Sequence, residues 1–322
     1  MDCKITIYPN ISQDQKQVIK SRLMPAHEFQ PVYLLSRGGH PESLHFGSIA
    51  VVDVNGQLIA SLGNPQRSIF PRSSAKPFQA MPLVEVGGIH HFGLNDVDLA
   101  LICSSHSGTD QHVEAIVALE AKIGIDEKDL LCGTQVPSHE NTARRMLING
   151  EQASKLRHNC SGKHSGMLAL ALLKGWPTQD YAMPNHPLQI VIKQSFASWT
   201  GIAGEDTAIG IDGCSAPNFA VPLQATALAY ARLMDPSDMT AEQIEASGQI
   251  RRAMTQRADM VAGPNRFDSA IMTATQGRIL SKSGAEGFQA FGLPAGALKK
   301  PPSLGDCDKN FRWGRAAKLV PR

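Results

Sequence analysis

A serine and a lysine lie three positions apart in the segment Arg72-Ser73-Ser74-Ala75-Lys76-Pro77. If this segment opens a helix, Ser73 and Lys76 share one face and their side chains can meet. A serine hydroxyl needs a neighbouring base to act as a nucleophile, and a lysine is such a base only when burial or a nearby cation lowers its pKa. The spacing therefore predicts a serine nucleophile activated by lysine. The same pattern also fits a serine that caps a helix, followed by a surface lysine.

A second group of reactive side chains opens a helical pattern at Cys160-Ser161-Gly162-Lys163-His164. The dipole at a helix N-terminus stabilises a thiolate such as that of Cys160. Cys160 and Cys214 could meet in space and share a metal ion, with His158 and His164 completing the site. No CxxC or HExxH pattern accompanies them, so Cys160 also fits a small buried apolar residue.

Three further polar positions follow strand-like runs. Asp212 lies in a tight turn, where its carboxylate could bind the ammonium group of a substrate, although Asp-Gly is also an ordinary turn sequence. Ser105-His106 follows the apolar run 99–103, and Lys282 follows the run 278–280. Ser105-His106 also fits a turn that satisfies backbone groups, and Lys282 also fits a lysine in solvent.

The composition is that of an ordinary globular protein. The chain has 322 residues, of which 42% are hydrophobic and 19% charged, so it can bury a large core in one or two domains. A net charge of +2 without a basic block argues against nucleic-acid binding. No apolar run approaches the roughly 20 residues of a membrane span. Six scattered cysteines, and opening residues without the apolar core of a secretory signal, predict a cytoplasmic location.

Hydrophobic patterns predict the elements that position these residues. Strands are expected over 32–35, 99–103, 208–211 and 278–280, and a hairpin joins 48–54 to 57–62 across Asn55-Gly56. Helices are expected over 11–23, 112–123, 162–173, 188–199 and 223–233. These elements indicate an α/β protein with an antiparallel or mixed sheet. We expect an N-terminal extension over 1–30, a catalytic domain over 31–298 and an atypical C-terminal tail over 299–322.

Together, these motifs resemble the thermolabile, Rhizobium-like L-asparaginases, also called the asparaginase II family. The motifs occur in the family's order between about residues 32 and 296. They are Arg37-Gly38-Gly39, Leu62-Gly63-Asn64-Pro65, Arg72-Ser73-Ser74-Ala75-Lys76-Pro77, Cys103-Ser104-Ser105-His106-Ser107, Cys132-Gly133, Asn159-Cys160-Ser161-Gly162-Lys163-His164, Asp212-Gly213-Cys214, Val261-Ala262-Gly263 and Lys282-Ser283-Gly284-Ala285-Glu286-Gly287.

The resemblance implies a fold like that of serine β-lactamases and penicillin-binding proteins, with a central, mainly antiparallel sheet flanked by helices, usually in a homodimer. It also implies hydrolysis of the L-asparagine side-chain amide to L-aspartate and ammonia. The family's two serine–lysine pairs fall here on Ser73 with Lys76 and on Ser105 with Lys282.

The resemblance also implies a zinc ion beside the substrate. Its ligands fall on Cys160, Lys163 and Cys214. Substrate binding is assigned to Asp212, His106 and Arg72.

In the expected reaction, Ser73 attacks the amide carbon after giving its proton to Lys76. The like charge of Lys282 keeps Lys76 neutral, and backbone N–H groups stabilise the oxyanion. Ser105 is an alternative nucleophile because it has a lysine partner of its own.

After Gly287 the sequence departs from the family's pattern, which continues with further strands and a long helix. Pro301-Pro302 interrupts any regular element here, and residues 306–322 show little periodicity. A truncated or frameshifted gene would give this sequence, so a catalytically impaired relative is one alternative. An amidohydrolase of another small amide is a second. A β-lactamase would need Lys-Thr-Gly, to which Lys282-Ser283-Gly284 is the only close match.

Overall fold

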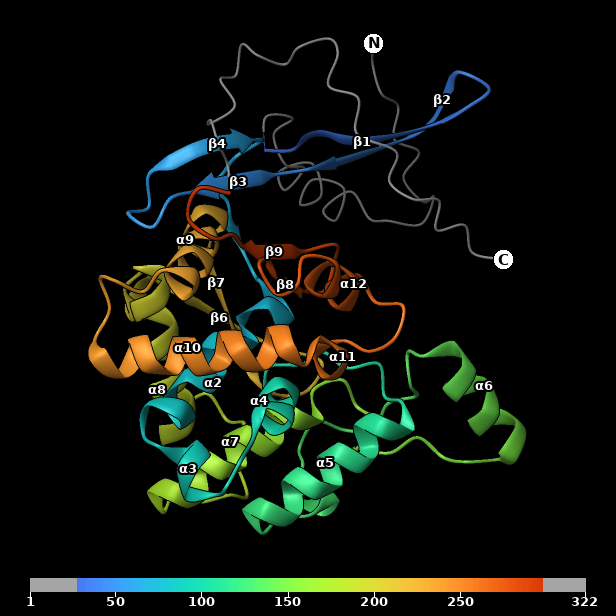
Figure 1. Cartoon of the computed structure of the whole chain (residues 1–322), viewed down its shortest axis with the longest axis vertical. Helices are drawn as coiled ribbons and strands as arrows, with labels where there is room; N and C mark the ends of the chain where they lie inside the picture. Colours follow the sequence, from blue (N-terminus) through green and yellow to red (C-terminus); the bar gives the residue numbers. More distant parts are fainter. Residues whose placement is uncertain (1–27, 298–322) are drawn as a thin grey trace, which may run out of the picture. The chain divides into compact units, whose positions relative to one another are not determined.

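The strands of the protein form four small sheets in the computed structural model, which describes residues 28–297 (Figure 1). Three of the sheets have two strands each and one has three. The two-stranded sheets pair β1 (Gln30–Arg37) with β2 (His40–Gly47), β3 (Ile49–Val52) with β4 (Leu58–Leu62), and β8 (Leu280–Ser283) with β9 (Gln289–Gly292). The three-stranded sheet has the antiparallel order β5 (Ser68–Ile69), β7 (Pro217–Pro222), β6 (Ala208–Ile211).

The described chain divides into two compact units. One contains residues 28–49 and 61–65, and the other contains 50–60 and 66–297. The boundary passes through the β3–β4 hairpin. All residues of the candidate site belong to the second unit.

Helices make up most of the second unit (Figure 1). They are α2 (Lys76–Glu85), α3 (Gly88–His91), α4 (Asp96–Ile102), α5 (Asp110–Ile123), α6 (Glu140–Asn149), α7 (Ser161–Lys174), α8 (Pro187–Thr200), α9 (Leu223–Met234), α10 (Ala241–Gln256), α11 (Ala258–Val261) and α12 (Phe267–Ala274). Short 3₁₀ turns lie at η1 (Arg72–Ala75), η2 (Glu127–Asp129) and η3 (Gly204–Asp206).

Helix α2 lies in the interior of this unit, with α7, α8 and α10 packed against it. Its residues from Lys76 to Val84 are all buried. The Phe78 ring lies 5.4 Å from the Tyr230 ring and 5.8 Å from the Trp199 ring, so aromatic packing fixes the helix. Because Lys76 is the first residue of this buried helix, its side chain starts inside the protein.

Most of the expected elements are confirmed. The hairpin turn lies at Asn55-Gly56, where Gly56 has φ 79° and Asp53 Oδ1 accepts the N–H groups of Asn55 and Gln57. The expected helices at 112–123, 162–173, 188–199 and 223–233 correspond to α5, α7, α8 and α9. The strand at 208–211 is β6. The last expected strand begins only at Leu280, so Lys282 lies within a strand and not after one.

The strand expected over 99–103 is wrong, because these residues belong to helix α4 and its C-cap. Asn95 accepts the N–H groups of Val97 and Asp98, while the Asp98 side chain accepts the N–H of Asn95, which is a complete capping box. Leu99 to Ile102 are buried all around. A fully buried short helix therefore has the same unbroken apolar run as a buried strand.

The α/β class is confirmed as a mixed structure of helices and small sheets. A β-lactamase-like layout around one central sheet and the three expected domain boundaries remain predictions. The expected helix 11–23 and tail 299–322 lie outside the described residues, as does nearly all of the extension 1–30. Among residues 28–297, no helix combines the length and apolar character needed to cross a membrane.

Candidate active site

Ser105 lies between two buried lysines. It belongs to the loop after α4, and its backbone N–H donates to Val261 O at 2.8 Å. The Nζ atom of Lys282 lies 2.8 Å from Ser105 Oγ, and the Nζ atom of Lys76 lies 3.1 Å from the same oxygen. The lysines are 0% and 2% exposed respectively, whereas Ser105 is only partly buried. One accessible hydroxyl therefore contacts two amines that are shielded from water.

The two lysines differ in their remaining partners. Lys76 Nζ also donates to Ser104 O at 2.5 Å and to Asn159 O at 3.0 Å. With Ser105 Oγ, these oxygens match the three donors of an ammonium group. Each N–H of a Lys76 ammonium group therefore has an oxygen acceptor in the site.

Lys282 is suited to losing its proton. Burial lowers its pKa, and the positive charge of Lys76 lowers it further, to about 7. Its Nζ atom has Ser283 O at 2.8 Å as a second partner. A neutral Lys282 can accept a proton from the Ser105 hydroxyl, which is the condition for a lysine base.

Ser73 lies in the η1 turn and is partly buried. Lys76 donates to Ser104, Ser105 and Asn159, and within the described part of the chain no hydrogen bond joins it to Ser73. The structure therefore brings together Ser105, Lys282 and Lys76, while the pairing of Ser73 with Lys76 stays a prediction.

Arg72 and Asp212 form an ion pair at the partly exposed side of the η1 turn. Arg72 Nε lies 2.5 Å from Asp212 Oδ1, and Asn218 Nδ2 donates to Asp212 Oδ2 at 3.0 Å. Arg72 has φ 53°, a left-handed conformation that costs a non-glycine residue about 1–2 kcal/mol. Such strain is typical of functional turns. The strained residue directly precedes Ser73 in the chain.

His106, expected to bind substrate, is 1% exposed and has partners on both ring nitrogens. Because the Ser161 hydroxyl donates to Leu156 O, His106 Nε2 donates to Ser161 Oγ, 2.9 Å away. His106 Nδ1 accepts the N–H of Gly108 at 3.2 Å. Burial lowers the pKa of His106 well below its ordinary value, as do the neighbouring His112 and Lys76. The neutral ring thus joins the Ser105 loop to the start of α7.

Cys160, Lys163 and Cys214 meet in one buried cluster. Lys163 Nζ lies 3.0 Å from Cys214 Sγ, and all three residues are at most 6% exposed. A hydrogen bond with Cys214 lowers the pKa of Cys160 well below that of an ordinary thiol. Burial opposes the charge of Lys163, but the neighbouring sulfurs of Cys160 and Cys214 raise its pKa on balance. Two thiolates and an amine are a donor set that suits Zn²⁺.

Two histidines flank this cluster. His158 Nδ1 accepts the N–H of Cys160 at 3.0 Å, so that nitrogen is already used. His164 is fully buried, and its Nδ1 contacts the Tyr181 hydroxyl at 2.7 Å. In the range 28–297, no three His, Cys, Asp or Glu side chains form a group that could hold a metal. A metal at Cys160 and Cys214 would therefore depend on the Lys163 amine.

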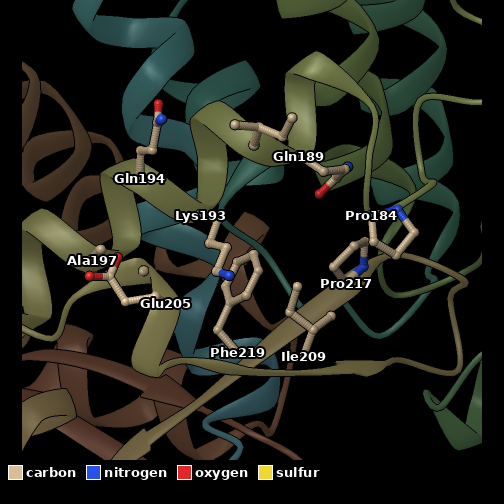
Figure 2. A pocket seen from close by; sticks show the side chains of 11 residues that line it. Pro184, Gln189, Lys193, Gln194, Ala197, Glu205, Ile209, Pro217 and Phe219 are labelled. Atoms are coloured by element: carbon tan, nitrogen blue, oxygen red, sulfur yellow. The ribbon is translucent and has the colours of Figure 1, made fainter.

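A pocket of about 450 Å³ lies between α8 and the β6–β7 strands (Figure 2). Figure 2 shows Gln189 and Lys193 of α8 facing Ile209, Pro217 and Phe219 of the sheet. Neither the serine–lysine cluster around Ser105 nor the Cys160, Lys163 and Cys214 cluster contributes a lining residue. The pocket is therefore separate from the serine–lysine cluster, although β7 follows the turn that carries Asp212 and Cys214.

Several residues that hold this site were not predicted from the sequence. Asn159 O accepts a hydrogen bond from Lys76, Ser74 Oγ donates to Lys282 O at 2.8 Å, and Asp268 bonds the strand around Lys282. The first of these is a backbone contact, for which side-chain type gives no signal. Ser281 and Ser283 on either side of Lys282 were a visible signal, because alternate strand residues face the same side.

Comparison with known families agrees with the motifs. A family model described as L-asparaginase II matches residues 34–300, which is most of the chain. The match supports a hydrolase of the asparaginase type. The chain belongs to the L-asparaginase II family, and the resemblance seen in its motifs is confirmed. A comparison with curated proteins found no match.

Proposed function

We propose that the protein hydrolyses the side-chain amide of L-asparagine to L-aspartate and ammonia. The family match supports amide hydrolysis of this kind. The observation that carries the proposal is the contact of Ser105 Oγ with both Lys282 and Lys76.

In this reaction Ser105 is the nucleophile and Lys282 the base. Neutral Lys282 takes the hydroxyl proton while Ser105 Oγ bonds to the amide carbon, giving a tetrahedral intermediate. Protonated Lys282 then gives a proton to the nitrogen, the C–N bond breaks, and ammonia leaves an acyl-enzyme. Water, deprotonated by the same lysine, releases L-aspartate and restores the serine.

Lys76 supplies the positive charge in this scheme. The N–H of Ser105 is occupied by Val261 O, so it does not serve as an oxyanion donor. The Lys76 ammonium lies 3.1 Å from Ser105 Oγ and stabilises the negative charge that develops on this oxygen as its proton leaves. These roles reverse the expectation that Lys76 is the base. Ser73 remains the alternative nucleophile, because it lies in the turn that precedes Lys76.

Arg72 and Asp212 are proposed to bind the charged ends of the substrate. A free amino acid carries a carboxylate and an ammonium group, which match the guanidinium and the carboxylate of this pair. The existing ion pair would open, so that each partner binds the substrate group of opposite charge. His106 would act indirectly, by holding the Ser105 loop.

The Cys160, Lys163 and Cys214 cluster fits a zinc ion, which these three side chains would hold. When bound, zinc would supply a fixed positive charge next to the Asp212 turn. The lysine ligand would have to be neutral, so metal binding would release its proton. A homodimer, a cytoplasmic location and a β-lactamase-like layout complete the proposal.

An ammonia assay on the purified protein with L-asparagine tests the function. We expect Ser105→Ala and Lys282→Met each to lower kcat at least about 1,000-fold, because an activated nucleophile and its base act as one unit. Ser73→Ala separates the two serines: retained activity supports Ser105, and complete loss assigns the attack to Ser73. Normal turnover in both Ser105→Ala and Lys282→Met would overturn the Ser105–Lys282 mechanism.

The same assay separates the alternatives. Turnover of L-glutamine or another small amide in preference to L-asparagine would assign a different amidohydrolase. A folded chain that releases no ammonia from any of these amides would be the catalytically impaired relative.

A further inference from the structure

Asp268 is a buried carboxylate that holds the strand carrying Lys282. It lies in the first turn of α12 and is 1% exposed. Its Oδ1 atom accepts from Ser281 Oγ at 2.7 Å and from Gln289 Nε2 at 3.0 Å. Its Oδ2 atom accepts from the N–H of Ser283 at 2.8 Å and from Ser283 Oγ at 2.6 Å. Three residues of the β8–β9 hairpin are thus tied to one carboxylate.

The direction of these bonds follows from strand geometry. Alternate residues of a strand face opposite sides, so Ser281 and Ser283 point to one side of β8 while Lys282 points to the other. Asp268 bonds the first side and Ser105 Oγ contacts Lys282 on the second. Asp268 therefore fixes Lys282 through both of its neighbours, without an ion-pair contact to the amine. A shift of about 1 Å in a catalytic group can lower a rate about 100-fold.

A charge at this position needs an explanation beyond hydrogen bonding. Burying a carboxylate is costly, and a neutral side chain could also accept hydrogen bonds from a strand. Burial opposes the charge of Asp268, but the charge of Lys282 and the bonds from Ser283 and Ser281 hold its pKa below the ordinary value. The titratable groups that act on Lys282 are Lys76, Asp268, Cys160 and Cys103. Asp268 is the carboxylate among them.

We propose that Asp268 is a positioning residue that orients Lys282 towards Ser105 and stabilises the protonated form of this lysine. Without the carboxylate, burial and the charge of Lys76 would act on Lys282 with less opposition, and the amine would bind its proton more weakly. Lys282 must both take and return a proton in each turnover, so its protonated form must be accessible. This inference rests on the proposed serine–lysine mechanism.

The test compares Asp268→Asn, which removes the charge, with Ser281→Ala and Ser283→Ala, which keep the charge and each remove one hydrogen bond. Asp238→Asn is the control, since Asp238 forms an exposed ion pair with Arg232. The first readout is the rate of labelling by an alkyl fluorophosphonate between pH 5 and 10. In this reaction a serine oxygen bonds to phosphorus, fluoride leaves, and the serine proton passes to the lysine. The second readout is kcat and KM for L-asparagine.

We expect Asp268→Asn to shift the midpoint of the labelling profile about one pH unit downward, since removal of an opposite charge weakens proton binding. We expect Ser281→Ala and Ser283→Ala to lower the labelling rate and kcat about 10-fold at an unchanged midpoint and an unchanged KM. The Asp238→Asn profile should match the wild type. Circular dichroism confirms that each variant is folded.

An unchanged midpoint in folded Asp268→Asn would overturn the electrostatic role. If Asp268→Asn does not fold, the serine variants decide: normal labelling rates in both would overturn the positioning role, and a moved midpoint would overturn the assignment of the titration to the carboxylate. A third outcome is that the wild type is labelled and Asp268→Asn shows the expected midpoint shift, but the wild type does not turn over L-asparagine. This outcome would support the inference and overturn the proposed substrate. No labelling of the wild type at any pH would overturn both.

Discussion

Lys282 and Lys76 place their amine nitrogens on the same hydroxyl oxygen, at 2.8 and 3.1 Å from Ser105 Oγ. Two ammonium groups buried against the same hydroxyl would repel each other, so the pKa of one of them is lowered. The three oxygen partners of Lys76 favour the charge there, while burial and Lys76 lower the pKa of Lys282 to about 7. The hydroxyl thus lies between a base and a cation.

The first prediction is that activity rises with pH through about 7. The base form of Lys282 is the neutral one and its pKa is lowered to about 7, so kcat/KM should fall about tenfold per unit below that pH and level off above it. Between pH 7 and about 10, the Lys282 amine binds fewer protons in the folded protein than in the unfolded chain. Lys282 therefore makes the free energy of unfolding increase with pH across that window.

A pH profile of ammonia release measures the first effect, and urea unfolding at pH 7 and 9 measures the second. In Lys282→Met the stability difference between these two pH values should shrink, since the titrating group is gone. A kcat/KM that stays constant from pH 5.5 to 8.5 would contradict the assignment of Lys282 as the base.

The second prediction concerns the ion pair of Arg72 and Asp212. Asp212→Asn and Arg72→Met should each raise KM for L-asparagine about 10- to 100-fold, because a charge-assisted hydrogen bond to one end of the substrate is lost. The matched control is Asp238→Asn, which removes a carboxylate from the exposed pair with Arg232 and should leave KM unchanged. Steady-state kinetics give KM and kcat separately. An effect on neither constant would remove both residues from substrate binding.

Sequence patterns predicted local elements better than contacts between residues that are distant in the chain. The amphipathic helices α5, α8 and α9 followed from spacing, because local periodicity determines which face is buried. Helix α7 was also predicted, although its residues from Ser161 to Ala171 are all buried. Helix α4 was not predicted, since a run buried on every side has no periodicity. Ser105 and Lys282 were recognised as a pair, and their contact is confirmed at 2.8 Å.

The partner of Lys76 could not be predicted from spacing. Positions i and i+3 suggest Ser73 when both residues lie in one regular helix. In the fold, Ser73 lies in a 3₁₀ turn and Lys76 begins a buried helix, so the long lysine side chain reaches residues 28, 29 and 83 positions away. Contacts of this range depend on tertiary packing. Asp268 was missed for the same reason, because its partners Ser281, Ser283 and Gln289 lie in a separate hairpin.

The third prediction concerns zinc. The purified protein should contain about one zinc per chain, and Cys160→Ser or Cys214→Ser should remove it, because thiolates are strong zinc ligands. Lys163→Met should lower the zinc affinity. Cys103→Ala is the control, since Cys103 is a buried free thiol outside this cluster and its substitution should leave the zinc content unchanged. Elemental analysis and the shift of Tm on adding a chelator measure binding independently of turnover. Equal zinc contents in the wild type and Cys160→Ser would exclude this site.

The fourth prediction tests the helix that replaces the expected strand. Asn95 accepts two backbone N–H groups at the start of α4, and Asp98 completes the capping box. Asn95→Ala should lower the free energy of unfolding by about 1 kcal/mol, the usual cost of losing such a cap. Asn185→Ala is the control: Asn185 is exposed and lies just before α8 without capping it, so its loss should change stability by less than about 0.5 kcal/mol. Urea unfolding measures both.

The consequence for the active site is separate from stability. The C-cap of α4 is Cys103, and the loop that begins there carries Ser105 only two residues later. The position of Ser105 is also fixed by Val261 O and by its two lysines, so fraying at the first turn of α4 should leave kcat within about twofold of the wild type while stability falls. A large loss of kcat in folded Asn95→Ala would show instead that the Ser105 loop depends on the whole helix. Equal stability of Asn95→Ala and the wild type would contradict the capping box.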